Sequence, residues 1–125
     1  MINIIRNKAF IQRFFCNWFV AKGNIISGYN FEQFIYGVFH YKYNTKPVIP
    51  AVIPKEKLKT IKVPVLMLMG EEEIIYNPMK AVASAKECIP HIDVKMIANA
   101  SHCLFIEKAE QVNQYMVNFL SDQEN

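Results

Sequence analysis

The sequence predicts an α/β fold, in which a helical region precedes a parallel β-α-β-α unit. Three observations carry this prediction: residues 7–43 hold two aromatic-rich segments at helical spacing, residues 44–56 hold three prolines, and residues 57–125 alternate apolar runs with amphipathic segments. Alternating strands and helices are typical of parallel sheets with right-handed connections. The 125 residues correspond to one domain of ordinary size.

The first segment, residues 7–22, predicts an amphipathic helix with a wide aromatic face. Gly23 follows it and is expected to end the helix. The positions that follow helical spacing are Phe10, Phe14 or Phe15, Trp18 and Val20.

The second segment, residues 30–43, predicts another aromatic helix, with Asn30 as its N-cap. The turn "GNIISGY" separates the two helices. Apolar positions recur at three- and four-residue steps through Phe31, Phe34, Ile35, Val38, Phe39 and Tyr41 or Lys42.

The connector, residues 44–56, reads "NTKPVIPAVIPKE" and is expected to be extended, because proline fixes its own backbone angle and disfavours helix at the preceding residue. It divides the chain into a helical, cap-like region with its connector, residues 1–56, and a β-α-β-α part, residues 57–125.

The second region begins with "KVPVLMLMG", a continuous apolar run that ends at Gly70 and predicts a strand covered on both faces. A helix follows, with Asn77 as its cap and Pro78 at its first position. "IDVKMIANA" predicts a second strand, and "KAEQVNQYMVNFLSDQ" a closing helix. A pair of parallel strands is marginal by itself, so this unit is expected to have neighbouring strands.

Composition narrows the function classes. The chain is 52% hydrophobic with a net charge of +3 and no block of basic residues, which disfavours nucleic-acid binding. Its apolar stretches are shorter than the ~20 residues that a membrane-spanning helix needs. The first residues lack the pattern of a signal peptide, so a cytoplasmic location is expected. Three unclustered cysteines are expected to be reduced and mostly buried, with no metal site and no cofactor.

Two loops follow the predicted strands, and each carries a residue type used in catalysis. "GEEEIIYNP" presents carboxylates and "NASHCLFIEKAEQ" presents His102. The carboxyl ends of adjacent parallel strands are where catalytic residues gather in open α/β sheets. A carboxylate bound to a histidine ring nitrogen is the supporting half of a Ser-His-acid relay.

These features together resemble the C-terminal part of an α/β-hydrolase of the serine esterase type. The resemblance is carried by a "VPVLMLMG" strand, an acid shortly after the glycine, a helix ending in "IP", a strand, and an "NASH" loop ahead of the closing helix. Residues 7–56 resemble the helical cap and the return to the core less specifically. The resemblance implies a partial α/β-hydrolase fold, with Glu73 as the acid and His102 as the catalytic histidine. Glu71 and Glu72 are expected to be solvated neighbours.

The sequence departs from the family at two places. Ser101 stands where the family has glycine before the histidine, and serine tolerates a positive φ less well. The 125 residues also contain no GxSxG nucleophile elbow. Loss of a triad nucleophile costs about a millionfold in rate, so the chain alone is expected to be inactive.

No other residue is expected to replace that serine. Ser27 follows no predicted strand, Cys16 lies in an aromatic helix, and Ser101 and Cys103 adjoin His102 in a loop whose neighbouring side chains point apart. His40 is expected on the aromatic face of the second helix and His91 on the surface.

Two hypotheses follow. In the first, the chain is part of an ester- or amide-cleaving hydrolase that is separated from its nucleophile half by truncation, by a split gene or by the boundaries of the sequence. Its partner is then that N-terminal half, and the complete enzyme acts on a small apolar ester-like substrate. In the second, it is a non-catalytic remnant that forms homo-oligomers through its apolar faces.

Overall fold

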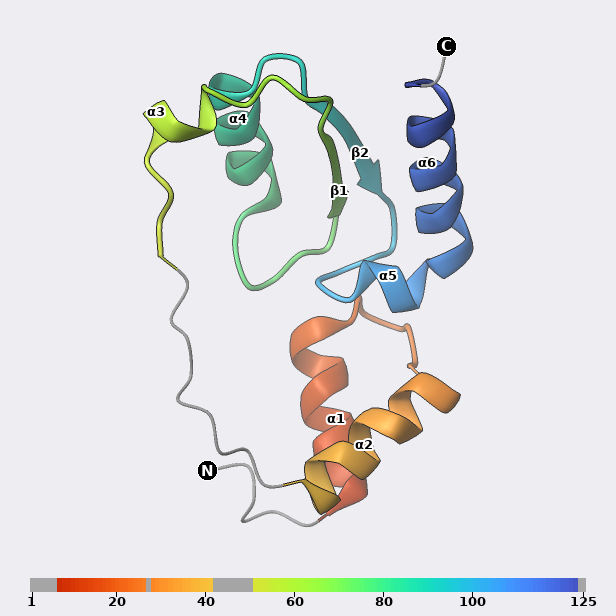
Figure 1. Cartoon of the computed structure of the whole chain (residues 1–125). Coiled ribbons are helices and arrows are strands. Elements are labelled where there is room, and N and C mark those ends of the chain that lie inside the picture. The colour runs from red at the N-terminus through yellow and green to blue at the C-terminus, as the bar shows by residue number, and fades with distance from the viewer. Residues whose placement is uncertain (1–6, 27, 42–50, 124–125) are drawn as a thin grey trace.

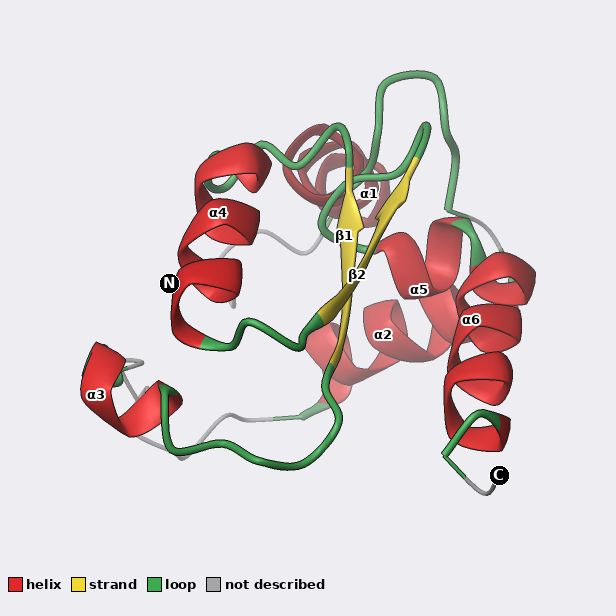
Figure 2. Ribbon diagram, turned by 90° about the horizontal axis from the view of Figure 1, so that it is seen from above, coloured by secondary structure: helices red, strands yellow, loops and turns green. Residues whose placement is uncertain are grey.

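The computed structural model describes residues 7–26, 28–41 and 51–123, which fold into a helical hairpin and an α/β unit. In the α/β unit, β1 (Leu66–Gly70) and β2 (Asp93–Ile97) run parallel, with Leu66 opposite Asp93 and Gly70 opposite Ile97. The connecting helix α4 (Pro78–Cys88) lies on one side of the strand pair and α6 (Ala109–Ser121) on the other (Figures 1 and 2). The predicted β-α-β-α order is therefore confirmed.

The burial of β1 is less complete than the sequence predicted. Met69 and Gly70 at its end are buried, whereas the three residues before them are half-buried. The sheet in the described part of the chain has two strands, so the coverage that further strands would give is absent there. The expectation of a strand covered on both faces is wrong for the first half of β1.

Helix α4 begins as predicted. Asn77 takes an extended conformation, and its side-chain oxygen accepts a hydrogen bond from the Lys80 amide at 2.9 Å. Pro78 occupies the first helical position, where its missing N–H costs nothing. The cap fixes the direction in which the chain leaves the loop after β1.

Helix α1 (Lys8–Phe19) begins at an Asn7 cap and ends earlier than predicted. The residues that follow Phe19 form a turn in which the Asn24 amide donates to the Ala21 carbonyl at 3.0 Å. Gly23 has a φ of 91° inside that turn, so it shapes the turn and does not end the helix.

Helix α2 (Tyr29–His40) begins before the predicted start. Its N-cap is Gly28, with a φ of 100° and no side-chain cap, and Asn30 lies within the helix. The Asn30 cap prediction is therefore wrong, because the chain turns into the helix two residues earlier, at a position with a φ that glycine tolerates. The predicted end of the helix, at residues 42–43, falls outside the described residues.

The hairpin buries only part of the apolar face that the sequence predicted for α1, namely Phe15 and Val20. Ile11 is buried and Phe15 packs beside it, whereas Phe10, Phe14 and Trp18 are half-exposed on another face. The hairpin core joins Ile11 to the following buried or partly buried residues: Val20, Ile26, Phe31, Ile35 and Phe39, with Cys103 and Ile106 from the α/β unit. The unit has its own smaller cluster around Ile97, Ala100 and Val112.

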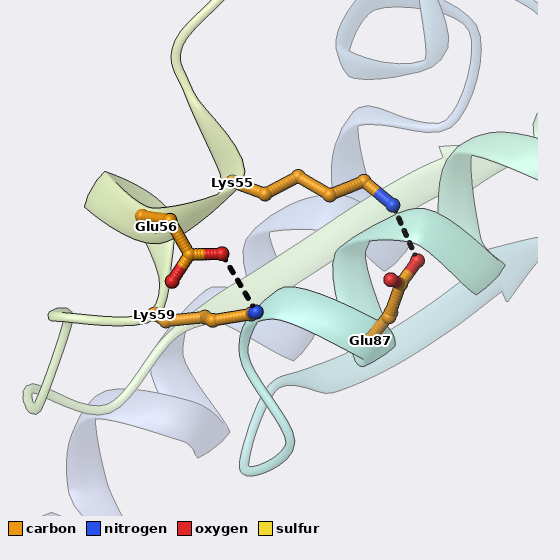
Figure 3. Close-up of polar contacts among 4 residues, drawn as sticks. All are labelled: Lys55, Glu56, Lys59 and Glu87. Atoms are coloured by element: carbon orange, nitrogen blue, oxygen red, sulfur yellow. Dashed lines mark hydrogen bonds and ion pairs between the residues drawn. The ribbon is translucent and has the colours of Figure 1, made fainter.

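The connector is described from residue 51 onward, and most of it, residues 44–50, lies outside the described residues. Residues 51–54 have no helix or strand, but Lys55–Leu58 form a short helix, α3, after Pro54, so the extended prediction is wrong for its last two residues. Lys55 Nζ binds Glu87 of α4 at 2.7 Å, and Glu56 binds Lys59 at 2.9 Å (Figure 3). The first pair joins α3 to α4, whereas the second lies within α3 and its C-cap.

The chain after β2 contains a short helix that the sequence did not predict, α5 (Leu104–Glu107). It precedes α6 and lies where the hairpin meets the α/β unit (Figure 1). Within the described residues, no helix is long and apolar enough to cross a membrane.

Candidate active site

The loops after β1 and β2 are held together by backbone contacts around Gly70. The Glu71 amide donates to the Ile97 carbonyl at 3.0 Å, and the Glu72 amide donates to the Ala100 carbonyl at 2.9 Å. A Cβ at Gly70 would overlap the Ala100 carbonyl oxygen. Glycine is thus required here by the close approach of the second loop.

Glu73 is the buried member of the three consecutive glutamates. Its side chain is 3% exposed, and one carboxylate oxygen, Oε1, accepts a hydrogen bond from the Ile75 amide at 2.8 Å. The other oxygen, Oε2, lies 2.8 Å from Nδ1 of His102. The carboxylate is therefore oriented by its own loop as well as by the histidine.

His102 lies in the loop after β2 with a side chain that is 39% exposed. An ionised carboxylate only accepts hydrogen bonds, so Nδ1 carries the proton in the pair with Glu73. In the neutral form of the ring, the other nitrogen, Nε2, then has a free lone pair, and no residue in the described part of the chain hydrogen-bonds to it. This is the tautomer that a general base requires.

Two aromatic rings lie near the histidine ring. The ring of Phe19, from the end of α1, is centred 5.7 Å from the imidazole, and the ring of Tyr76, from the loop after β1, is centred 6.2 Å away at 84°. Burial and the negative charge of Glu73 raise the pKa of Tyr76, so its hydroxyl stays protonated at neutral pH. The imidazole thus has an apolar ring from the end of α1 and a neutral phenol as its aromatic neighbours.

Comparison with known proteins gives the family of this arrangement. The chain is 32% identical over 112 residues to an uncharacterized carboxylesterase, nap, of Bacillus subtilis (strain 168), and 38% identical over 76 residues to carboxylesterase YbfK of the same organism. The matches cover 86% and 61% of this chain. No protein-family model matches.

Comparison with solved structures also gives carboxylesterases. The structure of carboxylesterase CesB (YbfK) from Bacillus subtilis superposes with a TM-score of 0.78 at 28% identity, over 95% of this chain and 44% of that one. Naproxen esterase from Bacillus subtilis gives a TM-score of 0.71 at 33% identity, over 86% of this chain and 40% of that one. The chain is a homologue of α/β-hydrolase carboxylesterases. It spans 37% and 26% of the length of the two curated relatives, so its fold is a partial α/β-hydrolase fold.

In this α/β-hydrolase homologue, a groove of about 390 Å³ adjoins the acid. One wall is the end of α1 with the following turn, including Cys16 and Asn17, and the other is residues 72–74. The groove therefore lies between the hairpin and the loop after β1, and Glu73 belongs to its lining.

Ser101 does not have the backbone conformation that its replacement of glycine had suggested. The non-glycine residue with a positive φ among those described is Asn99, at 52°. Asparagine tolerates the left-handed region better than most residues. The left-handed residue of this loop is thus Asn99, and Ser101 fits without that strain.

The other candidate nucleophiles stay unfavourable. Burial, with the nearby charges of Glu107 and Glu73, raises the pKa of Cys103 to about 11, so its thiol is protonated at neutral pH. Cys16 is a partly buried member of the hairpin core, and Ser27 lies outside the described residues. The cysteines at 16, 88 and 103 are all free, as predicted.

The remaining candidate histidines and glutamates do not contact the Glu73–His102 pair through hydrogen bonds in the described part of the chain. His40 is exposed and stacks on Tyr36 with ring centroids 4.0 Å apart, and exposed His91 contacts the Val63 carbonyl. Glu71 is exposed as predicted, but Glu72 is half-buried and accepts from the Lys22 amide at 3.2 Å. No cluster of three or more possible metal ligands occurs among the described residues.

Sequence reasoning missed the residues that attach the hairpin to the site. Glu107 accepts hydrogen bonds from both regions, and Asn24 donates to the Asn99 carbonyl at 2.8 Å. Phe19 and Tyr76 were also not predicted beside His102. The contacts of Glu107 and Asn24 with the other region, and that of Phe19 with His102, join segments about 80 residues apart, for which spacing in a single sequence gives no signal.

Proposed function

We propose that this chain supplies the acid and the base of a Ser-His-Glu relay in a carboxylester hydrolase. The observation that carries the proposal is the Glu73–His102 hydrogen bond of 2.8 Å, made by a buried carboxylate and a half-exposed imidazole at the ends of two parallel strands. The homologous carboxylesterases support the same reaction class.

In this mechanism, His102 Nε2 takes the proton of a serine hydroxyl as that serine attacks the ester carbonyl. The imidazolium that forms is stabilised by Glu73, whose carboxylate keeps the ring in the required tautomer. Nε2 then returns the proton to the leaving alcohol. The serine and the oxyanion hole would come from the part of the fold that the relatives have and this chain does not match.

The chain alone is therefore proposed to be inactive, and the groove beside Glu73 to form one wall of the substrate pocket. Aromatic groups around the histidine favour a small apolar ester. Amide cleavage uses the same relay and belongs to the same proposal.

The test is reconstitution. The segment of naproxen esterase that this chain does not match is co-expressed with the chain, and turnover of a short-chain aryl ester is measured. The isolated chain is expected to give no turnover above buffer, and the reconstituted pair to be active. His102→Ala is expected to reduce turnover by about a millionfold, and Glu73→Gln by about 10⁴-fold, because the first removes the base and the second removes the group that orients it.

His91→Ala is the matched control, since it removes an exposed histidine that contacts only a backbone carbonyl in the described structure. It is expected to leave turnover unchanged. Equal turnover in the His102→Ala and unmodified pairs would remove the assigned role. Turnover by the isolated chain would contradict the proposed inactivity.

A second candidate function is self-association without catalysis. It is favoured by the stripe of Phe10, Phe14 and Trp18 on α1, whose side chains are 50%, 47% and 55% exposed. Sedimentation at micromolar concentration tests it, with Trp18→Ser as the comparison. A monomer that is unchanged by this substitution would count against it.

A further inference from the structure

A single carboxylate joins the helical hairpin to the loop that carries His102. Glu107, the last residue of α5, accepts a hydrogen bond from the Ser101 amide through Oε1 at 2.9 Å. Its second oxygen, Oε2, accepts from the Ala21 amide at 2.8 Å and from the Asn24 side-chain amide at 2.7 Å. Ser101 belongs to the α/β unit, whereas Ala21 and Asn24 belong to the turn after α1.

The three donors require a carboxylate. Both oxygens of an ionised glutamate accept hydrogen bonds, and bonds to a charged acceptor are roughly twice as strong as neutral ones. Glutamine has the same shape, but its NH₂ group would face an N–H donor on one side. The arrangement therefore selects glutamate over its neutral isostere.

The residues immediately before and after His102 are both fixed by hydrogen bonds. Ser101, immediately before it, is fully buried and held by Glu107, and the amide of Cys103, immediately after it, donates to the Phe19 carbonyl at 2.9 Å. The Phe19 ring also lies beside the imidazole. The backbone on both sides of the histidine is therefore held against the end of α1 and its turn.

We infer that Glu107 is a positioning residue that ties the orientation of the His102 ring to the docking of the α1–α2 hairpin. Its meaning for catalysis rests on the proposed function, whereas the coupling is a property of the folded chain. If the hairpin moves away, Glu107 loses two donors, and the remaining bond to Ser101 no longer holds the loop at a fixed position. The Glu73–His102 bond then weakens.

The experiment uses the full chain and needs no ester turnover. Nuclear magnetic resonance follows the His102 Nδ1–H proton and the hydrogen exchange of the Ser101 and Ala21 amides. Glu107→Gln changes the carboxylate directly, whereas Asn24→Ala keeps the carboxylate and removes the hairpin's side-chain bonds to Glu107 and to the Asn99 carbonyl. Glu110→Gln is the matched control, because Glu110 is an exposed glutamate three residues further along with the same charge.

Glu107→Gln is expected to speed exchange of both amides about tenfold and to shift or broaden the His102 Nδ1–H signal. Asn24→Ala is expected to change Ser101 exchange and the His102 signal in the same direction by a smaller factor, and Glu110→Gln to change neither. If the His102 signal is unchanged in both Glu107→Gln and Asn24→Ala, the inference is overturned, even where the melting temperature falls. It is also overturned if Glu110→Gln changes the His102 signal as much as Glu107→Gln does. Failed reconstitution with these signals as expected would count against the proposed function alone.

Discussion

The two regions of this chain are stabilised in different ways. In the α/β unit, the loops that carry Glu73 and His102 are joined by backbone hydrogen bonds and by the close approach at Gly70. The α1–α2 hairpin has an aromatic core of its own, and it is tied to the unit by Cys103, Ile106 and the carboxylates of Glu72 and Glu107. The loops after β1 and β2 are thus held to each other mainly by backbone contacts, whereas the hairpin is attached by a few side chains and by the bond from the Cys103 amide to the Phe19 carbonyl.

The largest loss of stability is expected from a substitution in the core of the α/β unit. Ile97 is fully buried at the end of β2, and Ile97→Ala is expected to lower the free energy of unfolding by about 3–4 kcal/mol, through lost burial and the cavity left behind. Urea denaturation measures it. Ile25→Ala, at a residue 78% exposed, is the control and is expected to change little. Equal losses in both variants would contradict the assigned core.

Gly70→Ala tests the junction between the two loops. The added Cβ would overlap the Ala100 carbonyl, so we expect a loss of about 2–3 kcal/mol in unfolding free energy and disruption of the Glu73–His102 bond. Gly37→Ala in α2 is the control, because its Cβ would meet only the Tyr41 ring at 3.6 Å. This control is expected to stabilise the helix by roughly 0.5–1 kcal/mol. A Gly70→Ala protein as stable as the parent would remove the close-approach argument.

Cysteine labelling compares the reactivity of Cys103, from the α/β unit, with that of Cys16, from the hairpin, where the two regions meet. The thiolate is the reactive form, and a pKa of about 11 keeps Cys103 protonated up to that pH. At pH 8, Cys103 should react with iodoacetamide about 100-fold more slowly than a thiol of ordinary pKa near 9. Its rate should keep rising between pH 9 and pH 11, as read by mass spectrometry on peptides. The partly buried Cys16 provides the comparison within one sample, and a Cys103 rate that levels off near pH 9 would refute the raised pKa.

The smallest effect is expected at the contact between α3 and α4. The hydrogen bond and charge of Glu87 raise the pKa of Lys55, and Lys55 in turn lowers the pKa of Glu87. Both side chains are more than half exposed, and exposed pairs contribute little to stability. Lys55→Ala is therefore expected to leave the melting temperature unchanged within error. A clear decrease that persists at high salt would show that α3 matters more to the fold than its exposure indicates.

The sequence by itself determined the elements whose signals are local. Asn77 and Pro78 marked the start of α4, the apolar run ending at Gly70 marked β1, and the alternation of segments indicated a parallel pair. Resemblance to the α/β-hydrolases singled out Glu73 and His102, and the fold brings them together at 2.8 Å. The catalytic role of that pair stays a prediction.

Only the tertiary structure decided which aromatic stripe of α1 is buried, where α2 begins, and why one glutamate of three is enclosed. Glu71, Glu72 and Glu73 are the same residue type, and they differ only in what surrounds them: solvent, the hairpin turn, and His102. Glu107 likewise gave no signal in the sequence, because its partners lie 6, 83 and 86 positions away. Helix caps and strand patterns are set by neighbours along the chain, whereas the environment of a carboxylate is set by segments that meet only after folding.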